Sequence, residues 1–295
     1  PAMHTHAGGA VAKPFRTHHN ALDMDLYLRI APELHLKRLV VGGFERIYEM
    51  SRNFRNEGIS PMHNPEFTMM ELYQCYSNFE DVLRLAEEML PFCVERATGG
   101  LESEYKGEKI SWKPPYARFT YTKALEKFAE GFKESMMGDE AALRALAQKR
   151  RIDLSTSETP WDILDELFKH LVEPHLMQPT FITHLPRAMS PLSKPLAPDS
   201  PWAGRFEIYA GGMEIANAYS EQNDPDEQRA VFEAQVARDP ASGGGVDEDY
   251  ILALEHGMPP AAGLGVGMDR FTMVAAGAEN IREVIFFPLL RPKTE

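Results

Sequence analysis

Cysteine is scarce in this chain: Cys75 and Cys93 are the only two among 295 residues, too few for a disulfide framework. We therefore expect a protein of a reducing compartment, the cytoplasm. Long apolar runs are also lacking, since none approaches the roughly 20 residues that cross a bilayer. Residues 1–9 have neither the basic nor the apolar region of a secretory signal. These absences argue against a secreted or membrane protein.

Basic residues are in the minority, with 31 Lys and Arg against 44 Asp and Glu, for a net charge of -13. Nonspecific nucleic-acid binding needs clustered Lys and Arg to neutralise phosphates. We therefore expect no DNA partner, and we expect any RNA contact to be local or made by a segment outside this sequence. The acidic balance suits a cationic small substrate or a metal-bound phosphate, and it is equally well explained as a contribution to solubility.

Hydrophobic periodicity predicts mainly antiparallel strands with helices grouped between them, which is the α+β class. Strands are expected at residues 26–31, 45–54 and 66–76, in a hairpin over 205–221 that turns at Gly211-Gly212, and in a Gly-rich segment before 268. Helices are expected at residues 33–41, 79–97, 122–130, 138–150, 161–173, 224–238 and 247–256, and from about 268.

The same pattern predicts a division of the chain into two parts. Residues 1–98 and 201–295 form a core, and residues 99–200 form a largely helical insertion whose end, 186–204, is a Pro- and Ser-rich linker. The chain starts abruptly at Pro1, with no helix cap or strand before it. We expect a fragment that has lost an N-terminal region.

The long loop between the strands 45–54 and 66–76 carries polar side chains at both of its ends. Arg55 and Glu57 stand where the chain enters it, and His63, Asn64 and Phe67 stand where the chain leaves it. Loops of this length are usually functional or disordered. An arginine held there can bind a phosphate or carboxylate through two hydrogen bonds, and Phe67 can stack on a purine. Any one of these residues taken alone is more simply a surface ion pair or a core aromatic.

The segment GLGVGMDR, residues 263–270, resembles a phosphate-binding glycine loop only weakly. It departs from the dinucleotide fingerprint because it lacks the third glycine, and no Gly-Lys-Ser/Thr follows it. We expect Arg270 in the first turn of the following helix, directed back at the sheet, where it can meet a polyphosphate. The alternative is that the glycines only allow close packing of the backbone.

The hairpin 205–221 carries acidic and amide side chains. Asn217, Tyr219 and Glu221 should project on one face if the strand alternates regularly. Across the turn, Glu207 and Glu214 are expected to be facing partners. Mg²⁺ takes one or two carboxylates together with substrate phosphates, so this pair is a candidate magnesium site. The alternative is a solvated charged face, which the apolar neighbours of these residues disfavour.

Together these segments resemble the class II aminoacyl-tRNA synthetases, and within them the lysyl-tRNA synthetases. FRNEGIS and HNPEFTMMELY are similar to motif 2, GLGVGMDR to motif 3, and residues 14–58 to the region between motifs 1 and 2. The resemblance covers nearly the whole chain, less closely at 99–200. It implies the class II catalytic fold, a mainly antiparallel sheet flanked by helices. It also implies a homodimer that uses ATP and Mg²⁺ to convert lysine to lysyl-adenylate and then charges the acceptor end of tRNA(Lys).

The resemblance also implies roles for individual residues. Arg55 would bridge the substrate carboxylate and the ATP α-phosphate, and Arg270 would lie on the adenine near the γ-phosphate, so that both are catalytic. The other ATP-binding positions are Glu57, His63, Asn64, Phe67 and Glu207, and the Mg²⁺ carboxylates are Glu207 and Glu214. The lysine-binding positions are Gly9, Glu33, Arg55, Glu71, Tyr73, Asn217, Tyr219 and Glu221.

The chemistry of these residue types agrees with such a substrate. Glu33, Glu71 and Glu221 can pair two ammonium groups, while Arg55 and Asn217 hold the carboxylate. An aspartate substrate would need cationic partners instead. The lysine carboxylate is ionised at neutral pH, so the first step needs no general base, only positioning and charge stabilisation.

Three departures from the family pattern leave alternatives open. Pro1 resembles the last proline of motif 1, so the motif 1 helix and the anticodon-binding domain lie outside this sequence. Ala216 stands where many bacterial members have glycine, and Gln222 where leucine is usual. The related synthetase that attaches β-lysine to elongation factor P also carries alanine at that position, although the loop at 58–73 favours the tRNA enzyme. A third interpretation is a catalytically inactive lysine sensor, which the presence of all four charged catalytic and metal positions disfavours.

Overall fold

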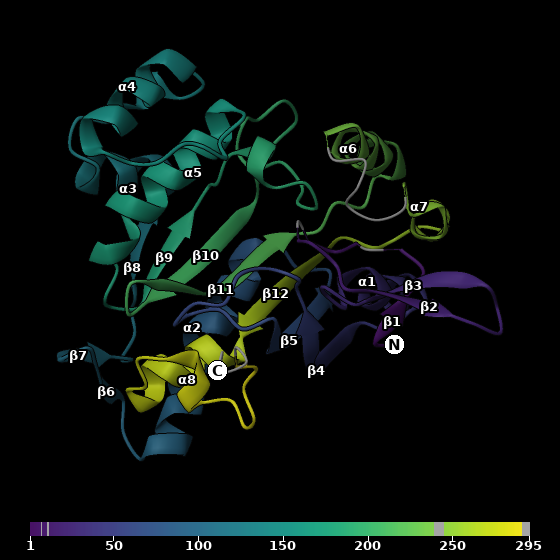
Figure 1. The fold of residues 1–295 in the computed structure, drawn as a ribbon, viewed down its shortest axis with the longest axis horizontal. Coiled ribbons are helices and arrows are strands. Elements are labelled where there is room, and N and C mark those ends of the chain that lie inside the picture. Colours follow the sequence, from purple (N-terminus) through teal and green to yellow (C-terminus); the bar gives the residue numbers. More distant parts are fainter. Residues whose placement is uncertain (7, 11, 239–244, 291–295) are drawn as a thin grey trace, which may run out of the picture.

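The computed structural model describes residues 1–6, 8–10, 12–238 and 245–290. A seven-stranded sheet organises the fold, in the order β4-β5-β12-β11-β10-β9-β8 (Figure 1). Its strands are β4 (Arg46–Phe54), β5 (Glu66–Cys75), β8 (Ala117–Thr120), β9 (Thr180–Thr183), β10 (Arg205–Ala210), β11 (Met213–Ser220) and β12 (Ala261–Gly267). Every neighbouring pair is antiparallel except β8 and β9. The predicted α+β fold, an antiparallel sheet flanked by helices, is confirmed.

Two small sheets accompany the large one. The first has the order β1-β3-β2, and the second pairs β6 with β7. Their strands are β1 (Met3–His4), β2 (Arg16–His19), β3 (Met24–Leu28), β6 (Glu102–Tyr105) and β7 (Glu108–Ser111).

Eight α-helices are found among the described residues. They are α1 (Glu33–Val41), α2 (Phe79–Thr98), α3 (Tyr121–Phe128), α4 (Glu140–Arg150), α5 (Pro160–Leu171), α6 (Pro225–Arg238), α7 (Glu248–Glu255) and α8 (Met268–Ala276). Four 3₁₀ turns complete the described elements: η1 (Glu134–Met136), η2 (Glu173–His175), η3 (Arg187–Met189) and η4 (Ile281–Glu283). None of these helices combines the length and the apolar character that a transmembrane span requires.

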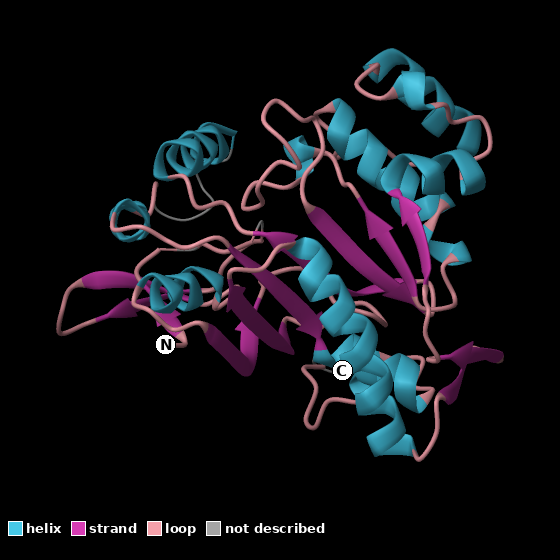
Figure 2. Ribbon diagram, turned by 180° about the vertical axis from the view of Figure 1, so that it is seen from behind, coloured by secondary structure: helices cyan, strands magenta, loops and turns pink. Residues whose placement is uncertain are grey.

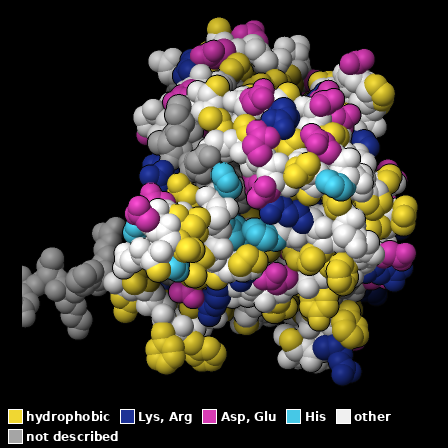
Figure 3. All heavy atoms as spheres, turned by 90° about the vertical axis from the view of Figure 1, so that its right-hand side faces the viewer, with side chains coloured by type: hydrophobic (Ala, Val, Ile, Leu, Met, Phe, Trp, Pro, Cys, Tyr) yellow, Lys and Arg dark blue, Asp and Glu magenta, His cyan; other side chains and the backbone are white. Residues whose placement is uncertain are grey.

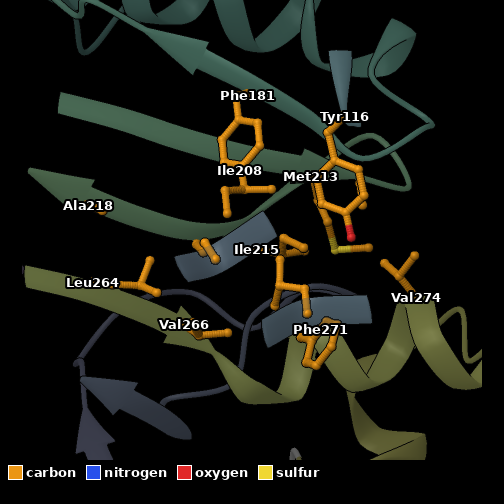
Figure 4. Packing of buried hydrophobic residues seen from close by; sticks show 14 of the residues in the cluster. Tyr116, Phe181, Ile208, Met213, Ile215, Ala218, Leu264, Val266, Phe271 and Val274 are labelled. Atoms are coloured by element: carbon orange, nitrogen blue, oxygen red, sulfur yellow. The ribbon is translucent and has the colours of Figure 1, made fainter. Parts of the chain in front are cut away.

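One face of the large sheet is covered by α2 and α8, which cross it in the rear view (Figure 2). Alternate residues of β10, β11 and β12 point to this side and pack with Phe271 and Val274 of α8 (Figure 4). Asn78, of a residue type favoured at helix N-caps, directly precedes the helix expected at 79–97, which predicts a cap there. In the structure Asn78 caps α2 by accepting hydrogen bonds from Glu80 N and Asp81 N. This layer forms the main hydrophobic core of the domain.

Two groups of helices, well separated in Figure 1, cover the two ends of the opposite face of the sheet. Helices α3, α4 and α5 form one apolar cluster that reaches Ile182 and Tyr209 at the β9–β10 end. Helices α1 and α7 form another that reaches Tyr73 and Cys75 of β5. The middle of this face, over β5, β12 and β11, is left open between the two clusters, and this opening positions the site.

The predicted elements agree with the structure to within a few residues, with several differences. The strand expected at 26–31 is β3, which ends at Leu28, because Ile30 and Ala31 are buried in the turn that enters α1. Residues 99–200 contain α3, α4 and α5 but also β8 and β9, which pair with the main sheet. The segment 186–204 includes η3 and contributes Met189, Ser190 and Leu192 to the site described below.

Candidate active site

A cavity of about 460 Å³ lies over the open middle of the sheet, which is within the usual range for small-molecule sites. Its walls come from the loop between β4 and β5, from β5 and β11, from the N-terminus of α1 and from the start of α8. Segments far apart in the sequence therefore meet in one space. Arg55 and Arg270 both line it, so the two arginines singled out in the sequence share one cavity.

Arg55 stands at the point where β4 ends and the long loop begins. Its backbone N–H donates to Pro65 O at 2.8 Å, which ties the two ends of the loop together. Its guanidinium carbon lies 5.1 Å from the centroid of the Phe67 ring, and its Nε is buried without a hydrogen-bond partner among the described residues. Burial lowers the pKa of this guanidinium, while Glu57 and Glu214 act in the opposite direction. A half-buried guanidinium group on a cavity wall is suited to receiving an anion.

Arg270 lies in the first turn of α8 and points back at the sheet, as predicted. It donates to Glu214 O at 3.1 Å and to Met62 O at 3.3 Å. Its Nη2 lies 2.7 Å from His63 Nε2. Burial, with the nearby Arg270, lowers the pKa of His63 to about 4, so the imidazole is neutral. Because Nε2 accepts from Arg270, we assign the ring proton to Nδ1, which then donates to Ser60 Oγ at 2.7 Å.

Three carboxylates, Glu33, Glu71 and Glu221, gather in another part of the cavity, which we call the acid end. Two tyrosines orient them. The Tyr219 hydroxyl donates to Glu33 at 2.6 Å, and the Tyr73 hydroxyl donates to Glu71 at 3.0 Å. All three glutamates are almost completely buried. Burial, reinforced by Glu33, raises the pKa of Glu71 to about 8, and burial also raises the pKa of Glu221 to about 8. The empty pocket therefore holds more acid groups than it can keep ionised at neutral pH, as expected for a site that receives cations.

The glycines of β12 form the floor of this cavity. Gly263, Gly265 and Gly267 alternate with Leu264 and Val266, which point into the hydrophobic core. A Cβ at Gly263 would lie 2.4 Å from Glu221 Oε1 and 2.6 Å from the Tyr73 ring. The Gly-x-Gly-x-Gly spacing thus follows from the two-residue period of a strand, and it leaves room for acidic and aromatic side chains rather than forming a phosphate loop.

The pair of Glu207 and Glu214 is arranged differently from the prediction. Glu207 is opposite Asn217, and Glu214 is opposite Tyr209, because β11 has one extra residue between positions 214 and 216. The expectation that the two glutamates face each other is therefore wrong. This β-bulge nevertheless places Glu214 on the cavity face with Asn217.

Glu207 itself is engaged by its neighbours. It lies 2.6 Å from Arg205 Nη2 and accepts a hydrogen bond of 2.8 Å from the Tyr209 hydroxyl. It is not among the described residues that line the cavity, whereas Glu214 is. Burial, followed by the charge of Glu207, raises the pKa of Glu214 to about 7. Within the described ranges, no three His, Cys, Asp or Glu side chains converge as a preformed metal site.

Every other predicted site residue lines the cavity. The set is Gly9, Glu33, Arg55, Glu57, His63, Asn64, Phe67, Glu71, Tyr73, Glu214, Asn217, Tyr219, Glu221 and Arg270. The structure adds two residues that sequence reasoning missed. Arg205 donates to Asn217 Oδ1 at 3.0 Å, and Lys37 pairs with Glu33 and Glu221. The only sequence signals were the i, i+2 spacing of Arg205 and Glu207 and the i, i+4 spacing of Glu33 and Lys37.

Comparison with known proteins identifies the family of this chain. Residues 1–291 match the family model described as tRNA synthetases class II (D, K and N). The chain is 49% identical to a lysine–tRNA ligase of Moorella thermoacetica, over 100% of the chain and 61% of that protein. It is also 49% identical to one of Coxiella burnetii (strain Dugway 5J108-111) and 48% identical to one of Pelotomaculum thermopropionicum, over 99% of the chain and 59% of each protein. It thus spans about 60% of the length of these curated relatives. With motif residues from both ends of the chain meeting in one cavity, the chain belongs to the class II tRNA synthetases of the D, K and N group.

Proposed function

We propose that this chain is the catalytic part of a lysine–tRNA ligase, which activates lysine with ATP and transfers it to tRNA(Lys). One observation carries the proposal: a single cavity joins a carboxylate-rich end to an end with two arginines. The names of the curated relatives support the same substrate. A substrate with two ammonium groups and one carboxylate matches the charges of this cavity.

The acid end would bind the ammonium groups of lysine. Glu33, Glu71 and Glu221 supply the acceptors, and Tyr73 and Tyr219 hold two of them in place. Aspartate or asparagine, which the family name also covers, would bring its own acceptor oxygens into a pocket already lined with carboxylates. Polar groups left unpaired in this way reject a wrong substrate strongly, by roughly 10⁴-fold or more.

The lysine carboxylate would be bound between the two ends of the cavity, by Arg55 and Asn217. Arg205 donates a hydrogen bond to Asn217 Oδ1, which leaves the amide nitrogen of Asn217 to donate to a substrate oxygen. The guanidinium group of Arg55, which lines the same cavity, supplies further donors. Gly9 lines this cavity beside α1 and has a φ of +89°. Because a residue with a side chain would be strained at that angle, glycine suits the place that we propose for Gly9 in lysine binding.

ATP would bind at the arginine end. We assign its adenine to Phe67 and Arg270, and its triphosphate to the guanidinium groups of Arg55 and Arg270. Glu57, His63 and Asn64 line the same region. The hydrogen bond from Arg270 to neutral His63 pre-orders the guanidinium without cancelling its charge.

Glu214 and Glu207 would hold Mg²⁺ together with phosphate oxygens. The donor chemistry fits, because the pKa of Glu214 is raised by burial and by Glu207, so a cation between them is favoured. The metal would neutralise charge on the triphosphate. Glu207 can reach it only if its contact with Arg205 loosens.

In the first step, a carboxylate oxygen of lysine forms a bond to the α-phosphorus while the bond to pyrophosphate breaks. Arg55 would hold the attacking carboxylate and the α-phosphate together, and Arg270 would stabilise the leaving phosphates. The chain needs no general base for this step, since the nucleophile is already ionised. In the second step, the 3′-terminal hydroxyl of tRNA would attack the carbonyl carbon of the lysyl-adenylate and lose its proton, while the bond to the phosphate breaks and AMP leaves.

We also propose that the working enzyme is a cytoplasmic homodimer. Tyr48 and Met50 of the edge strand β4 are 75% and 54% exposed, although they point to the same side as the core-packed Met70 and Leu72. An apolar sheet face that continues past its covering helices is typical of an interface. On the side drawn in Figure 3, acidic and basic side chains are interspersed rather than gathered by sign, which fits a tRNA contact that is local and not spread over this side. Cys75 and Cys93 are free thiols, which fits a reducing compartment.

ATP–pyrophosphate exchange with lysine, aspartate, asparagine and β-lysine tests the proposal. We expect exchange with lysine alone, followed by lysine-dependent charging of tRNA(Lys). Exchange with β-lysine only would identify the elongation factor P enzyme, the alternative that Ala216, buried beside the cavity, favours. Lysine binding with no exchange in the full-length protein would identify a sensor and refute the proposal.

A further inference from the structure

Lys37 is the most deeply buried charged side chain beside the acid end, with no exposed surface at all. It lies one turn after Glu33 on α1, and its Nζ is 2.6 Å from Glu33 Oε1. The same Nζ contacts Glu221 Oε2 and lies 5.4 Å from the centroid of the Tyr219 ring. Lys37 does not line the cavity, whereas Glu33 and Glu221 do. The ammonium group therefore sits behind the wall of the pocket and holds two of its carboxylates.

Burying an ammonium group is costly unless it is paired, and even a paired one often stabilises a fold less than an apolar residue. Burial works to lower the pKa of Lys37, but Glu221 and Glu33 outweigh it and raise that pKa above its ordinary value. The side chain is therefore permanently charged. Its neighbours on α1, Leu36 and Val40, pack in an apolar core, whereas Lys37 turns its ammonium group toward two carboxylates of the site. An ammonium group buried against two carboxylates of the site points to a role at the site.

The charges of the acid end add up in a specific way. When all are ionised, Glu33, Glu71 and Glu221 carry three negative charges, and Lys37 carries one positive charge. Two negative charges remain. Lysine brings two ammonium groups, so the occupied pocket would be neutral, while an amino acid with a single ammonium group would leave one buried carboxylate uncompensated.

We propose that Lys37 is a positioning and specificity-determining residue that sets the net charge of the acid end to that of a doubly charged substrate. This inference rests on the proposed function. Lys37 acts through Glu33 and Glu221 and does not touch the substrate. Without Lys37, the acid end could have a net charge of two negative units only if one of its three carboxylates kept a proton.

This requirement gives the substitution Lys37→Gln a signature in its pH dependence. The groups that face Glu221 are Lys37 and Glu33 from α1, Glu71 and Tyr73 from β5, Tyr219 from β11 and Tyr250 from α7. None of them other than Lys37 is a cation, so the compensating proton must reside on a carboxylate. That compensating proton is lost as the pH rises.

The test measures the lysine KM of wild type and Lys37→Gln by ATP–pyrophosphate exchange between pH 6.5 and 9. The ratio of the two KM values should be smallest at low pH and should rise with pH, approaching tenfold per pH unit because one proton is involved. The KM for ATP should remain within about threefold of wild type. A ratio that does not change with pH, or equal effects on both KM values, would indicate a merely structural lysine and overturn the proposal.

Lys37→Gln leaves Glu33 and Glu221 without a cationic partner, and such a change can prevent folding. The matched pair Glu33→Gln and Glu33→Gln/Lys37→Gln provides a second test, in which removing Lys37 deprives only one carboxylate, Glu221, of its cation. In the single variant Glu33→Gln, the acid end keeps one net negative charge, and removing Lys37 as well restores two. The double variant should therefore bind lysine more tightly than the single variant. Tighter binding of lysine by the single variant would contradict the charge argument. Failure of the wild type to exchange with lysine would instead refute the proposed function.

Discussion

The substitution Gly263→Ala tests the shape of the acid end with a single methyl group. An added Cβ would lie 2.4 Å from Glu221 Oε1 and 2.6 Å from Tyr73 Cε1, whereas ordinary contact begins at 3.4 Å. Both side chains would have to move by about 1 Å to restore an ordinary contact distance. Glu221 would then lose its aligned contact with Lys37 and with a substrate ammonium group. One charge-assisted hydrogen bond contributes about 1.5–3 kcal/mol.

We therefore expect Gly263→Ala to raise the lysine KM by roughly 10- to 150-fold in ATP–pyrophosphate exchange. The KM for ATP should change little. Gly267→Ala is a matched control on the same strand and face, since its Cβ would meet only Ile215 O, at 3.7 Å. Its lysine KM should stay within about threefold of wild type. If the two alanine variants have the same lysine KM, the steric argument for the glycine floor is wrong.

Three further predictions follow from the site. Arg55→Lys keeps the charge but loses the planar fork, so the exchange rate should fall by roughly 10²- to 10³-fold; a loss under tenfold would contradict the proposed bridging role. Glu214→Gln should raise the Mg²⁺ concentration for half-maximal exchange by roughly tenfold or more, with an unchanged lysine KM; an unchanged Mg²⁺ requirement would remove Glu214 from the metal site. The pKa values of Glu71 and Glu221 rise on folding from 4.5 to about 8. Their protonated forms therefore stabilise the empty fold at low pH, and this contribution is lost as the pH rises through 8. The thermal midpoint should fall between pH 6 and 8.5, and saturating lysine should raise it more at pH 8.5; a larger lysine effect at pH 6 would refute the assignment of these two carboxylates.

Much of the fold could be predicted from local patterns. The helix over residues 33–41 and the capping of α2 by Asn78 were predicted correctly, because periodicity and capping depend on residues close in the sequence. The hairpin turn at Gly211-Gly212 was also predicted, and both glycines have positive φ. The short strands β8 and β9 were missed, because four-residue strands buried between helices carry little periodic signal.

The site was predicted less completely than the fold. Resemblance and residue chemistry identified the side chains of both the arginine end and the acid end, and the structure places all of them except Glu207 on one cavity. The roles given to these residues stay predictions. Lys37 and Arg205 were missed because each interacts with site residues from outside any recognised motif.

What the sequence alone determined is therefore the type of most elements and the chemistry available to them. The tertiary structure decided which charges meet: Lys37 with Glu221, Arg55 with Arg270 in one cavity, and Glu207 with Arg205 rather than with Glu214. The bulge in β11 that returns Glu214 to the cavity face leaves no mark in a two-residue period. The physical reason is the distance along the chain over which each effect acts. Propensity and periodicity act over a few residues, whereas electrostatic pairing in the interior depends on strand order and register, which only the packed sheet defines.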